Sequence, residues 1–421
     1  MNISGPNFHK KLPNLWIFKN TLTLEFLKIF KYIFLRGICY FIVLCTVLHN
    51  SLFVFWDHNS VFAQLQSNNT SVYLPLVLKD YSNSFFTEDK FIGIYMPVYW
   101  QNKEIVNYNL GKANQLAGKT HSVVGWFIGL QDKAFLRSDL ADWEFSVNNF
   151  YRQLEALWNE GYISFVNIGS GNVAEYSSNE NCPYKATLST IANGSCDKAI
   201  RVMAKIYKKW VSLGNGRKAF FALFPEMNDT TNIDNYTSGD IESFKKGFQR
   251  IRQIFVEENI ENRVWWVFAP NGWSEPGHEF EKYYPGDDLV DIVAFSSYNF
   301  GYCWVMEEWG QWADYEMVFK RYLTRFQEMA PSKPIIIAQT GVVPDYSYTN
   351  EKNYYKKNEW IRDNYIKLSM EPPILGVLYF DIDGNCNWGI TSQQDYRYTG
   401  YADGTLNYKK LTSFEIDRII K

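Results

Sequence analysis

The chain has 421 residues, and 46% of them are hydrophobic, which is enough for a large core in one or two domains. Its net charge is −3, but residues 1–36 hold six basic residues against the single acid Glu25, so the rest of the chain carries −8. An acidic body argues against nucleic acid as a partner, because phosphate binding needs a basic face. Aromatic residues make up 18% of the chain, with 15 Trp and 29 Tyr. This content is typical of a surface that binds sugars, but a general bias of the composition towards Tyr would explain it equally well.

The N-terminal segment indicates export. A basic flank ending at Arg36 precedes the uncharged run 37–48, and small residues follow at Val61 and Ala63. This pattern predicts a secretory signal peptide over residues 1–63, cleaved after Ala63. The alternative is an uncleaved membrane anchor, because residues 38–56 are nearly long enough to span a bilayer. Either way we expect the body to be secreted or anchored on the extracytoplasmic side, with membrane contact only through this segment.

Residues 64–90 are polar and rich in Asn and Ser, apart from a short apolar patch at 72–78, and they predict a linker. From Phe91 onward, short apolar runs alternate with amphipathic segments of helical length. The apolar runs are residues 91–98, 122–130, 163–169, 219–224, 264–269, 292–297, 334–338 and 374–380. The helical segments are residues 146–160, 197–213, 239–258, 314–329, 351–368 and 411–420, with a short, weak one at 110–118.

Apolar runs of this kind are typical of strands buried on both faces, as in a parallel sheet covered by helices. Eight of them alternating with helices predict an α/β fold, a (β/α)8 TIM barrel over residues 91–421, more than an open doubly wound sheet. The first run is not followed by a glycine-rich phosphate-binding fingerprint, so we expect no nucleotide and no other cofactor.

In such a barrel the functional residues follow the carboxyl ends of the strands. Polar and aromatic residues stand at these points after the last five runs, and we expect them to meet at one end of the barrel. They are Glu226, Asn228, Asn271, Trp273, Tyr298, Gln339 and Trp388.

Five strand-end segments share a pattern with one known family. They are Pro225-Glu226-Met227-Asn228, Val267-Phe268-Ala269-Pro270-Asn271, Tyr284-Pro285-Gly286-Asp287 leading to Val290-Asp291, Ser297-Tyr298-Asn299, and Lys333-Pro334-Ile335 through Thr340-Gly341. In this order and spacing they resemble glycoside hydrolase family 26, the β-mannanase family, over about residues 91–400. The resemblance implies a barrel that hydrolyses β-mannan or a related β-glycan with retention, using two carboxyl groups about 5–5.5 Å apart.

The resemblance also implies roles for individual residues. Glu226 would donate the proton, and Asn228 beside it would order the sugar. Tyr298 would hydrogen-bond the nucleophile, and Trp388 would form an aromatic wall near the cleaved bond. Asn271 and Trp273 would line the same substrate site. The position of the family's nucleophile falls on Gln339.

A glutamine at this position departs from the family pattern, because a neutral amide cannot act as the carboxylate nucleophile. Three explanations stay open. The chain binds a glycan without cleaving it, or Gln339 is an introduced Glu→Gln change that traps substrate, or another acid such as Asp345, Asp381 or Asp383 has taken over. Pro225 is a second departure, since many members place His before the acid. A different class of function is a carbohydrate-binding or envelope-associated scaffold.

Four cysteines lie outside the N-terminal segment, namely Cys182, Cys196, Cys303 and Cys386. In an oxidising compartment they can pair in three ways. Cys303 and Cys386 follow the sixth and eighth apolar runs, so we expect them on the same rim, while Cys182 and Cys196 would close a short loop. No CxxC motif and no Cys/His cluster occurs, so we expect no metal site.

Overall fold

The computed structural model describes residues 43–47, 50–57, 60–67, 70–76, 89–96, 103–135, 144, 147–169, 182, 186–231, 239–301, 303, 312–344, 354–382, 386–391 and 399–421. The chain divides into two compact units, Met1–Ser82 and Asn83–Lys421.

The first unit contains an antiparallel sheet of four strands in the order β1-β2-β3-β4. The strands are β1 (Val43–Val47), β2 (Asn50–Asp57), β3 (Ser60–Ser67) and β4 (Thr70–Leu76). Residues 64–90, predicted as a linker, contain β4 and the end of β3, and Thr70, Val72 and Tyr73 favour this extended conformation. Cleavage after Ala63, a position within β3, stays a prediction.

Among the described residues, no helix is both long and apolar enough to cross a membrane.

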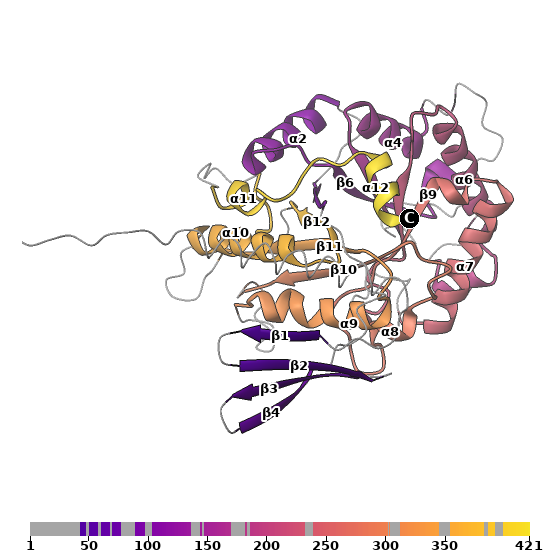
Figure 1. Cartoon of the computed structure of the whole chain (residues 1–421). Coiled ribbons are helices and arrows are strands. Elements are labelled where there is room, and N and C mark those ends of the chain that lie inside the picture. The colour runs from indigo at the N-terminus through magenta and orange to yellow at the C-terminus, as the bar shows by residue number, and fades with distance from the viewer. Residues whose placement is uncertain are drawn as a thin grey trace, which may run out of the picture. The chain divides into compact units, whose positions relative to one another are not determined.

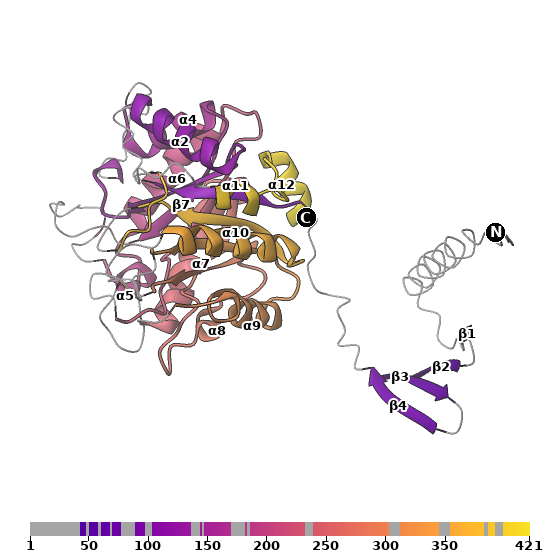
Figure 2. The same ribbon diagram turned by 90° about the vertical axis from the view of Figure 1, so that its left-hand side faces the viewer.

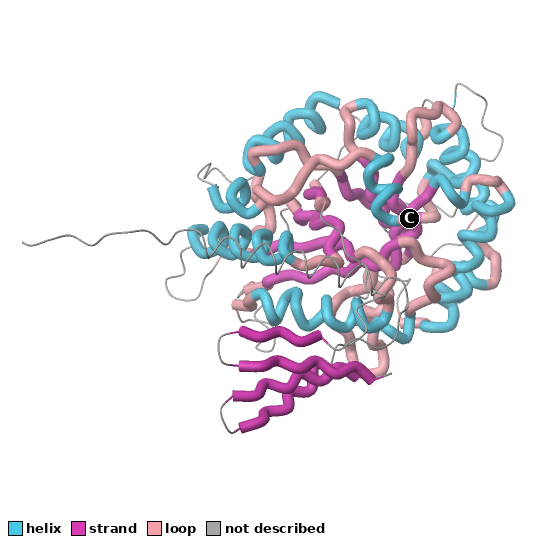
Figure 3. Tube along the Cα trace, viewed as in Figure 1, coloured by secondary structure: helices cyan, strands magenta, loops and turns pink. Residues whose placement is uncertain are grey.

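The second unit is a closed barrel of eight parallel strands, as predicted. The strands are β5 (Phe91–Tyr95), β6 (Val123–Gly129), β7 (Ile163–Gly169), β8 (Ala219–Leu223), β9 (Val264–Phe268), β10 (Ile292–Asn299), β11 (Ile335–Val342) and β12 (Ile374–Phe380). Each strand pairs with its sequence neighbour, and β12 pairs with β5 to close the ring. Figure 3 shows these strands enclosed by helices.

Helices surround the strands, as Figure 1 shows. They are α2 (Lys103–Ala117), α4 (Asn149–Asn159), α5 (Leu188–Ala192), α6 (Asp197–Val211), α7 (Ile241–Glu257), α8 (Phe280–Tyr283), α9 (Arg321–Met329), α10 (Tyr354–Met370), α11 (Thr399–Gly404) and α12 (Ser413–Ile420). All eight predicted strands and the predicted long helices are confirmed. The weak segment at 110–118 is wrong in its extent, because α2 begins seven residues earlier, in a polar stretch with no apolar periodicity.

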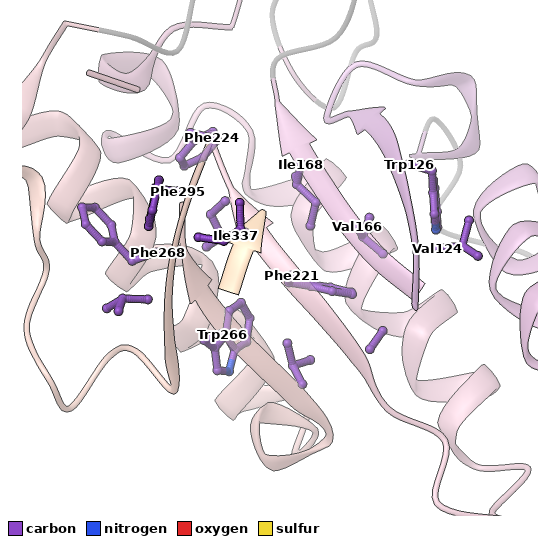
Figure 4. Packing of buried hydrophobic residues seen from close by; sticks show 14 of the residues in the cluster. Val124, Trp126, Val166, Ile168, Phe221, Phe224, Trp266, Phe268, Phe295 and Ile337 are labelled. Carbon is purple, nitrogen blue, oxygen red and sulfur yellow. The ribbon is translucent and has the colours of Figure 1, made fainter. Parts of the chain in front are cut away.

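Successive residues of a strand point alternately into the barrel and towards the helices, and both sides are apolar, so each strand is a continuous apolar run in the sequence. Phe220 and Ala222 of β8 belong to the buried cluster inside the barrel, whereas Phe221 and Leu223 belong to the cluster between strands and helices. Figure 4 shows this outer layer, with Trp266 and other labelled side chains packed between the barrel wall and the helices. Both faces of each strand are therefore buried.

The amino end of the barrel is closed by the last helix. Ile416 of α12 and the preceding Leu411 belong to the buried cluster of the barrel interior. Asp417 accepts a hydrogen bond from Trp265 Nε1 at 2.8 Å and pairs with Lys218 at 2.8 Å. In Figure 2, α12 lies at the opposite end of the barrel from α5, which follows β7. The residues after the carboxyl ends of the strands are thus on the end that α12 leaves open.

Two disulfides link the four cysteines in the pairs expected from their positions. Cys182 and Cys196 have a Cα–Cα distance of 4.1 Å and are separated by 14 residues. Cys303, after β10, and Cys386, after β12, have a Cα–Cα distance of 5.7 Å and are separated by 83 residues.

The two disulfides are expected to stabilise the fold unequally, because the bond that closes the longer loop removes more conformational freedom from the unfolded chain. Replacing Cys303 and Cys386 together by Ala should lower the free energy of unfolding by about 4–5 kcal/mol, and replacing Cys182 and Cys196 by about 3 kcal/mol. Chemical denaturation of the two double variants measures the difference. Equal losses, or a larger loss for the shorter loop, would contradict it.

Candidate active site

The chain turns sharply at the end of β8, and this turn positions Glu226. Phe224 and Glu226 both have left-handed backbone conformations, with φ of 52° and 57°, which are uncommon for residues other than glycine. The amide of Glu226 donates to the carbonyl of Ala269 at 2.9 Å, so the turn is fixed to the end of β9. Such strain clusters at functional sites, where the surrounding structure holds it in place.

The environment of Glu226 favours its protonated form. Burial raises the pKa of this carboxyl, the nearby Ser296 hydroxyl acts in the opposite direction, and the negative charge of Asp229 raises the pKa further. A carboxyl that keeps its proton towards neutral pH is suited to general acid catalysis.

Gln339 lies in β11 and is only 4% exposed. The register between β10 and β11 shifts here, since Phe295 pairs with Ile337 whereas Ser296 pairs with Gln339. Ala338 is therefore an extra residue in β11, and such bulges commonly redirect side chains next to active sites. Gln339 Oε1 accepts a hydrogen bond from the Tyr298 hydroxyl at 3.0 Å.

Tyr298 connects the two residues to which the sequence assigns chemistry. Its hydroxyl contacts Gln339, and its pKa is raised by burial and then by the negative charge of Glu226. Ser296, opposite Gln339 in the sheet, also lies within reach of Glu226. Glu226 and Gln339 thus lie at the same end of the barrel, on either side of the β10 residues Ser296 and Tyr298.

A row of aromatic rings crosses this end of the barrel. Successive centroids along it are 5.5, 6.1, 5.8, 5.0 and 5.2 Å apart, in the order Phe127, Tyr95, Phe380, Tyr298, Trp388, Phe300. Trp388 is 8% exposed, so little of its ring is open to solvent, whereas Phe127 is 51% exposed.

Sequence reasoning identified Tyr298 and Trp388 but missed the other four rings. Tyr95 and Phe380 are the last residues of their strands, and Phe127 lies near the end of β6. An aromatic residue at the carboxyl end of a strand was therefore the sequence feature that could have identified them. Gly125 is required beside them, because a Cβ at this position would overlap the Tyr95 ring. Tyr95 also accepts a hydrogen bond from Asn167 Nδ2 at 2.8 Å and lies in the field of Glu226.

Asn228 is fully buried and holds the loop after β9. Its Nδ2 lies 2.9 Å from the carbonyl oxygens of Asn271 and Trp273, while its Oδ1 accepts from the amide of Asn271 at 2.8 Å. Asn271 Oδ1 in turn accepts from the amide of Trp273 at 3.0 Å. These contacts give the Asn228 amide a structural role, and its role in ordering a sugar stays a prediction.

The segment that carries Trp388 is fastened to the barrel by several groups. The buried Lys357 of α10 donates to the carbonyls of Asn387, Trp388 and Gly389 at 2.8 to 3.0 Å. Tyr379 donates to the Trp388 carbonyl at 2.9 Å, and the Cys303–Cys386 disulfide ties the segment to the loop after β10.

Asp381, one of the candidate replacement acids, also holds the Trp388 segment in place. Its carboxylate accepts from the amides of Ile390 and Thr391 and from the Thr391 hydroxyl, and it is 4% exposed. The other two acids considered from the sequence, Asp345 and Asp383, lie outside the described residues.

Among the residues that the structure describes, no cluster of three or more His, Cys, Asp or Glu side chains could hold a metal ion.

The raised pKa of Glu226 predicts how the stability of the fold depends on pH. A carboxyl with a higher pKa in the folded state destabilises the fold as it is forced to ionise, so stability is lost as pH rises above the ordinary Glu pKa. Glu226→Gln should therefore be more stable than the parent protein, with an advantage that grows as pH rises through this window. Thermal unfolding at a series of pH values tests this, with the exposed Glu316→Gln as the control. A constant difference between Glu226→Gln and the parent across that range would contradict it.

The contacts of Asp381 make a second prediction. Asp381→Ala should lower the free energy of unfolding by about 1–3 kcal/mol, because it removes the acceptor of the Ile390 and Thr391 amides and leaves them unpaired. It should also loosen the Trp388 segment and weaken glycan binding. Denaturation and calorimetric titration measure both effects, with the exposed Asp363→Ala of α10 as the control. Unchanged stability in Asp381→Ala would show that the carboxylate is not structural.

Known proteins with a similar sequence or fold include glycoside hydrolases. No family model matches the chain. Endoglucanase H of Acetivibrio thermocellus is 29% identical over 226 residues, which cover 51% of this chain and 22% of that enzyme. The match thus spans about a fifth of the length of endoglucanase H.

Solved structures with similar folds include several glycoside hydrolases. GH26C from Muricauda sp. has a TM-score of 0.54 at 15% identity, covering 81% of this chain and 90% of that one. A GH26 β-mannanase from Bacteroides ovatus has a TM-score of 0.52 at 13% identity, with coverages of 79% and 93%. A β-mannanase from a symbiotic protist of the termite Reticulitermes speratus, complexed with gluco-manno-oligosaccharide, has a TM-score of 0.50 at 14% identity, with coverages of 78% and 90%. The chain is thus similar in fold to the barrels of glycoside hydrolase family 26, as its strand-end motifs predict.

Proposed function

We propose that this chain is an exported barrel protein that binds β-linked glycans at a glycosidase-type site, with Glu226 as acid/base and Gln339 in the place of the nucleophile. One observation carries the proposal: Tyr298 donates to Gln339 and lies in the field of Glu226. The proposed proton donor Glu226 and the neutral amide of Gln339 thus both lie close to the Tyr298 ring. The fold likeness to β-mannanases, one of them in complex with gluco-manno-oligosaccharide, supports β-mannan or a related β-glycan as the ligand.

With an amide at position 339, the site lacks the nucleophilic carboxylate of the two-carboxylate mechanism. A retaining glycosidase of the two-carboxylate type needs a carboxylate that attacks the anomeric carbon and offsets the positive charge that develops there. An uncharged amide does neither. We therefore expect the protein to bind unsubstituted β-glycans and to cleave them slowly or not at all by double displacement.

The aromatic row supports glycan binding. Flat apolar rings stack on the C–H faces of sugars, and Phe127 at one end of the row is half exposed. The acidic body of the chain, at −8 beyond residue 36, agrees with a neutral polysaccharide as partner and disagrees with nucleic acid.

Two features support export. The basic flank and apolar run of the N-terminal segment are those of a signal peptide or an anchor, which would also supply the only membrane contact. The two disulfides are typical of an oxidising compartment outside the cytoplasm.

A second candidate function is a carbohydrate-binding or envelope-associated scaffold with no catalysis. The neutral Gln339 favours it, whereas the strained turn and raised pKa of Glu226 favour an enzyme. Restoring a carboxylate at position 339 discriminates between the two.

Gln339→Glu should turn a protein that barely cleaves β-glycans into one that does. The gain should be several orders of magnitude, about 10³-fold or more, because loss of a catalytic nucleophile commonly costs at least that much. Release of reducing ends from mannan, xylan and mixed-linkage β-glucan measures it. Pro225 can limit the gain if it leaves Glu226 poorly oriented.

Two controls accompany this experiment. Gln339→Ala removes the partner of Tyr298 without adding a carboxylate and should stay inactive, and Glu226→Gln in the Gln339→Glu background should abolish the gained activity. Robust hydrolysis of these glycans by the unchanged protein would show that another acid acts as nucleophile. If neither version cleaves or binds any β-glycan, the scaffold function is correct.

A further inference from the structure

Among the residues that the structure describes, the site has a proton donor and no carboxylate in the place of the nucleophile. Glu226 is a partly buried carboxyl with a raised pKa, and the group across Tyr298 from it is the neutral amide of Gln339. The nearby acid Asp381 is occupied by the backbone amides of Ile390 and Thr391. An amide does not attack carbon, and burial and the charge of Glu226 raise the pKa of Tyr298 well above its usual range, so its phenol stays protonated and is a poor nucleophile. A cleavage reaction at these described side chains therefore needs a nucleophile from elsewhere.

We propose that the substrate supplies it: the site takes β-linked 2-acetamido sugars, and the carbonyl oxygen of the acetamido group attacks the anomeric carbon. This inference rests on the proposed function, because it assigns a substrate class to the same site. Substrate-assisted cleavage is a known alternative to the two-carboxylate mechanism in glycoside hydrolysis.

The reaction balances with water as the only other reagent. In the first step the acetamido oxygen bonds to C1, the bond from C1 to the leaving oxygen breaks, and Glu226 gives its proton to that oxygen. The products are a cyclic oxazolinium ion and the Glu226 carboxylate. In the second step water attacks C1 and gives a proton to Glu226, the ring opens, and the acetamido group is restored. Two inversions at C1 retain the β configuration.

Gln339 is placed to orient the acetamido group. Its Oε1 has two lone pairs, and the Tyr298 hydroxyl uses one of them. The second can accept the acetamido N–H, which turns the acetamido carbonyl towards C1 and stabilises the positive charge of the oxazolinium ion. No charge is needed on residue 339, because the cation is balanced by the carboxylate that Glu226 becomes.

The surroundings of Gln339 also suit the acetamido methyl group. The Trp388 and Phe380 rings pack on Tyr298, with centroids 5.0 and 5.8 Å away, and Trp388 contacts Gly341 two residues after Gln339. These rings give an apolar lining beside the amide. Gln339 Nε2 has no acceptor among the described residues, so the amide also has a donor available to the ligand.

A matched pair of oligosaccharides tests the proposal with the full-length protein. Tetra-N-acetylchitotetraose, called chitotetraose below, and cellotetraose differ only in the group at C2, acetamido against hydroxyl. The unchanged protein should cleave chitotetraose at least about 10³-fold faster than cellotetraose, because a well-oriented internal nucleophile reaches effective molarities of about 10⁵ M or more. Proton NMR of the first product should show the β anomer.

Variants separate the roles of the two side chains. Glu226→Gln should slow chitotetraose cleavage by roughly 10²–10⁴-fold, the usual contribution of general acid–base catalysis. Gln339→Ala should slow it by roughly 10²–10³-fold, as loss of one stabilising polar group commonly does. The thiazoline analogue of the oxazolinium ion should bind the unchanged protein at least about 10²-fold more tightly than N-acetylglucosamine. This binding measurement needs no turnover, and thermal unfolding verifies that each variant is folded.

Three results would overturn the proposal: an α-anomeric first product, equal cleavage of both tetrasaccharides, or neither cleavage of chitotetraose nor tight binding of the thiazoline. If Gln339→Glu gains activity on mannan or β-glucan while the unchanged protein ignores chitotetraose and the thiazoline, the substrate-assisted mechanism is wrong and the proposed function stands. If no version binds or cleaves any of these glycans, both are wrong.

Discussion

The pairing of β12 with β5, from Gly376↔Phe91 to Phe380↔Tyr95, closes eight parallel strands into a ring, and the other features of the domain depend on this closure. It leaves no free strand edge and brings the carboxyl ends of all the strands to one rim. The closure has a steric condition, since Gly376 lies against the Phe91 ring and a Cβ there would overlap it. With α12 across the amino end, polar residues that would be costly inside the barrel gather at the open rim.

At that rim, burial takes over a task that a second carboxylate performs elsewhere. In a two-carboxylate site the negative neighbour helps keep the acid protonated. Here Gln339 is neutral, and burial is the largest influence that raises the pKa of Glu226. A carboxyl held towards its protonated form beside a neutral amide fits the binding site that we propose, or a reaction whose nucleophile arrives with the substrate.

The rim is also held rigid by polar groups that do no chemistry. Asn228 fixes the loop after β9, and Lys357 and Asp381 fix the segment of Trp388 through backbone contacts. Buried polar groups of this kind persist because each has partners, and removing one leaves the others unpaired. The sequence suggests a sugar ligand at Asn228 and a candidate acid at Asp381, whereas the structure shows both side chains hydrogen-bonded within the protein.

The sequence by itself determined the strand order and the end of the barrel where the candidate site lies, because eight apolar runs with helices between them admit few other folds and parallel strands place their carboxyl ends together. It also indicated Glu226, Tyr298 and Gln339, since each closely follows one of the apolar runs in the sequence. Only the tertiary structure decided which polar groups remain available: Asn228 and Asp381 are occupied by contacts to loops that are distant in sequence. The aromatic row and the bulge at Ala338 were likewise beyond sequence reasoning, because ring contacts and strand register depend on how separate strands pair, and neither leaves a periodic pattern along the chain.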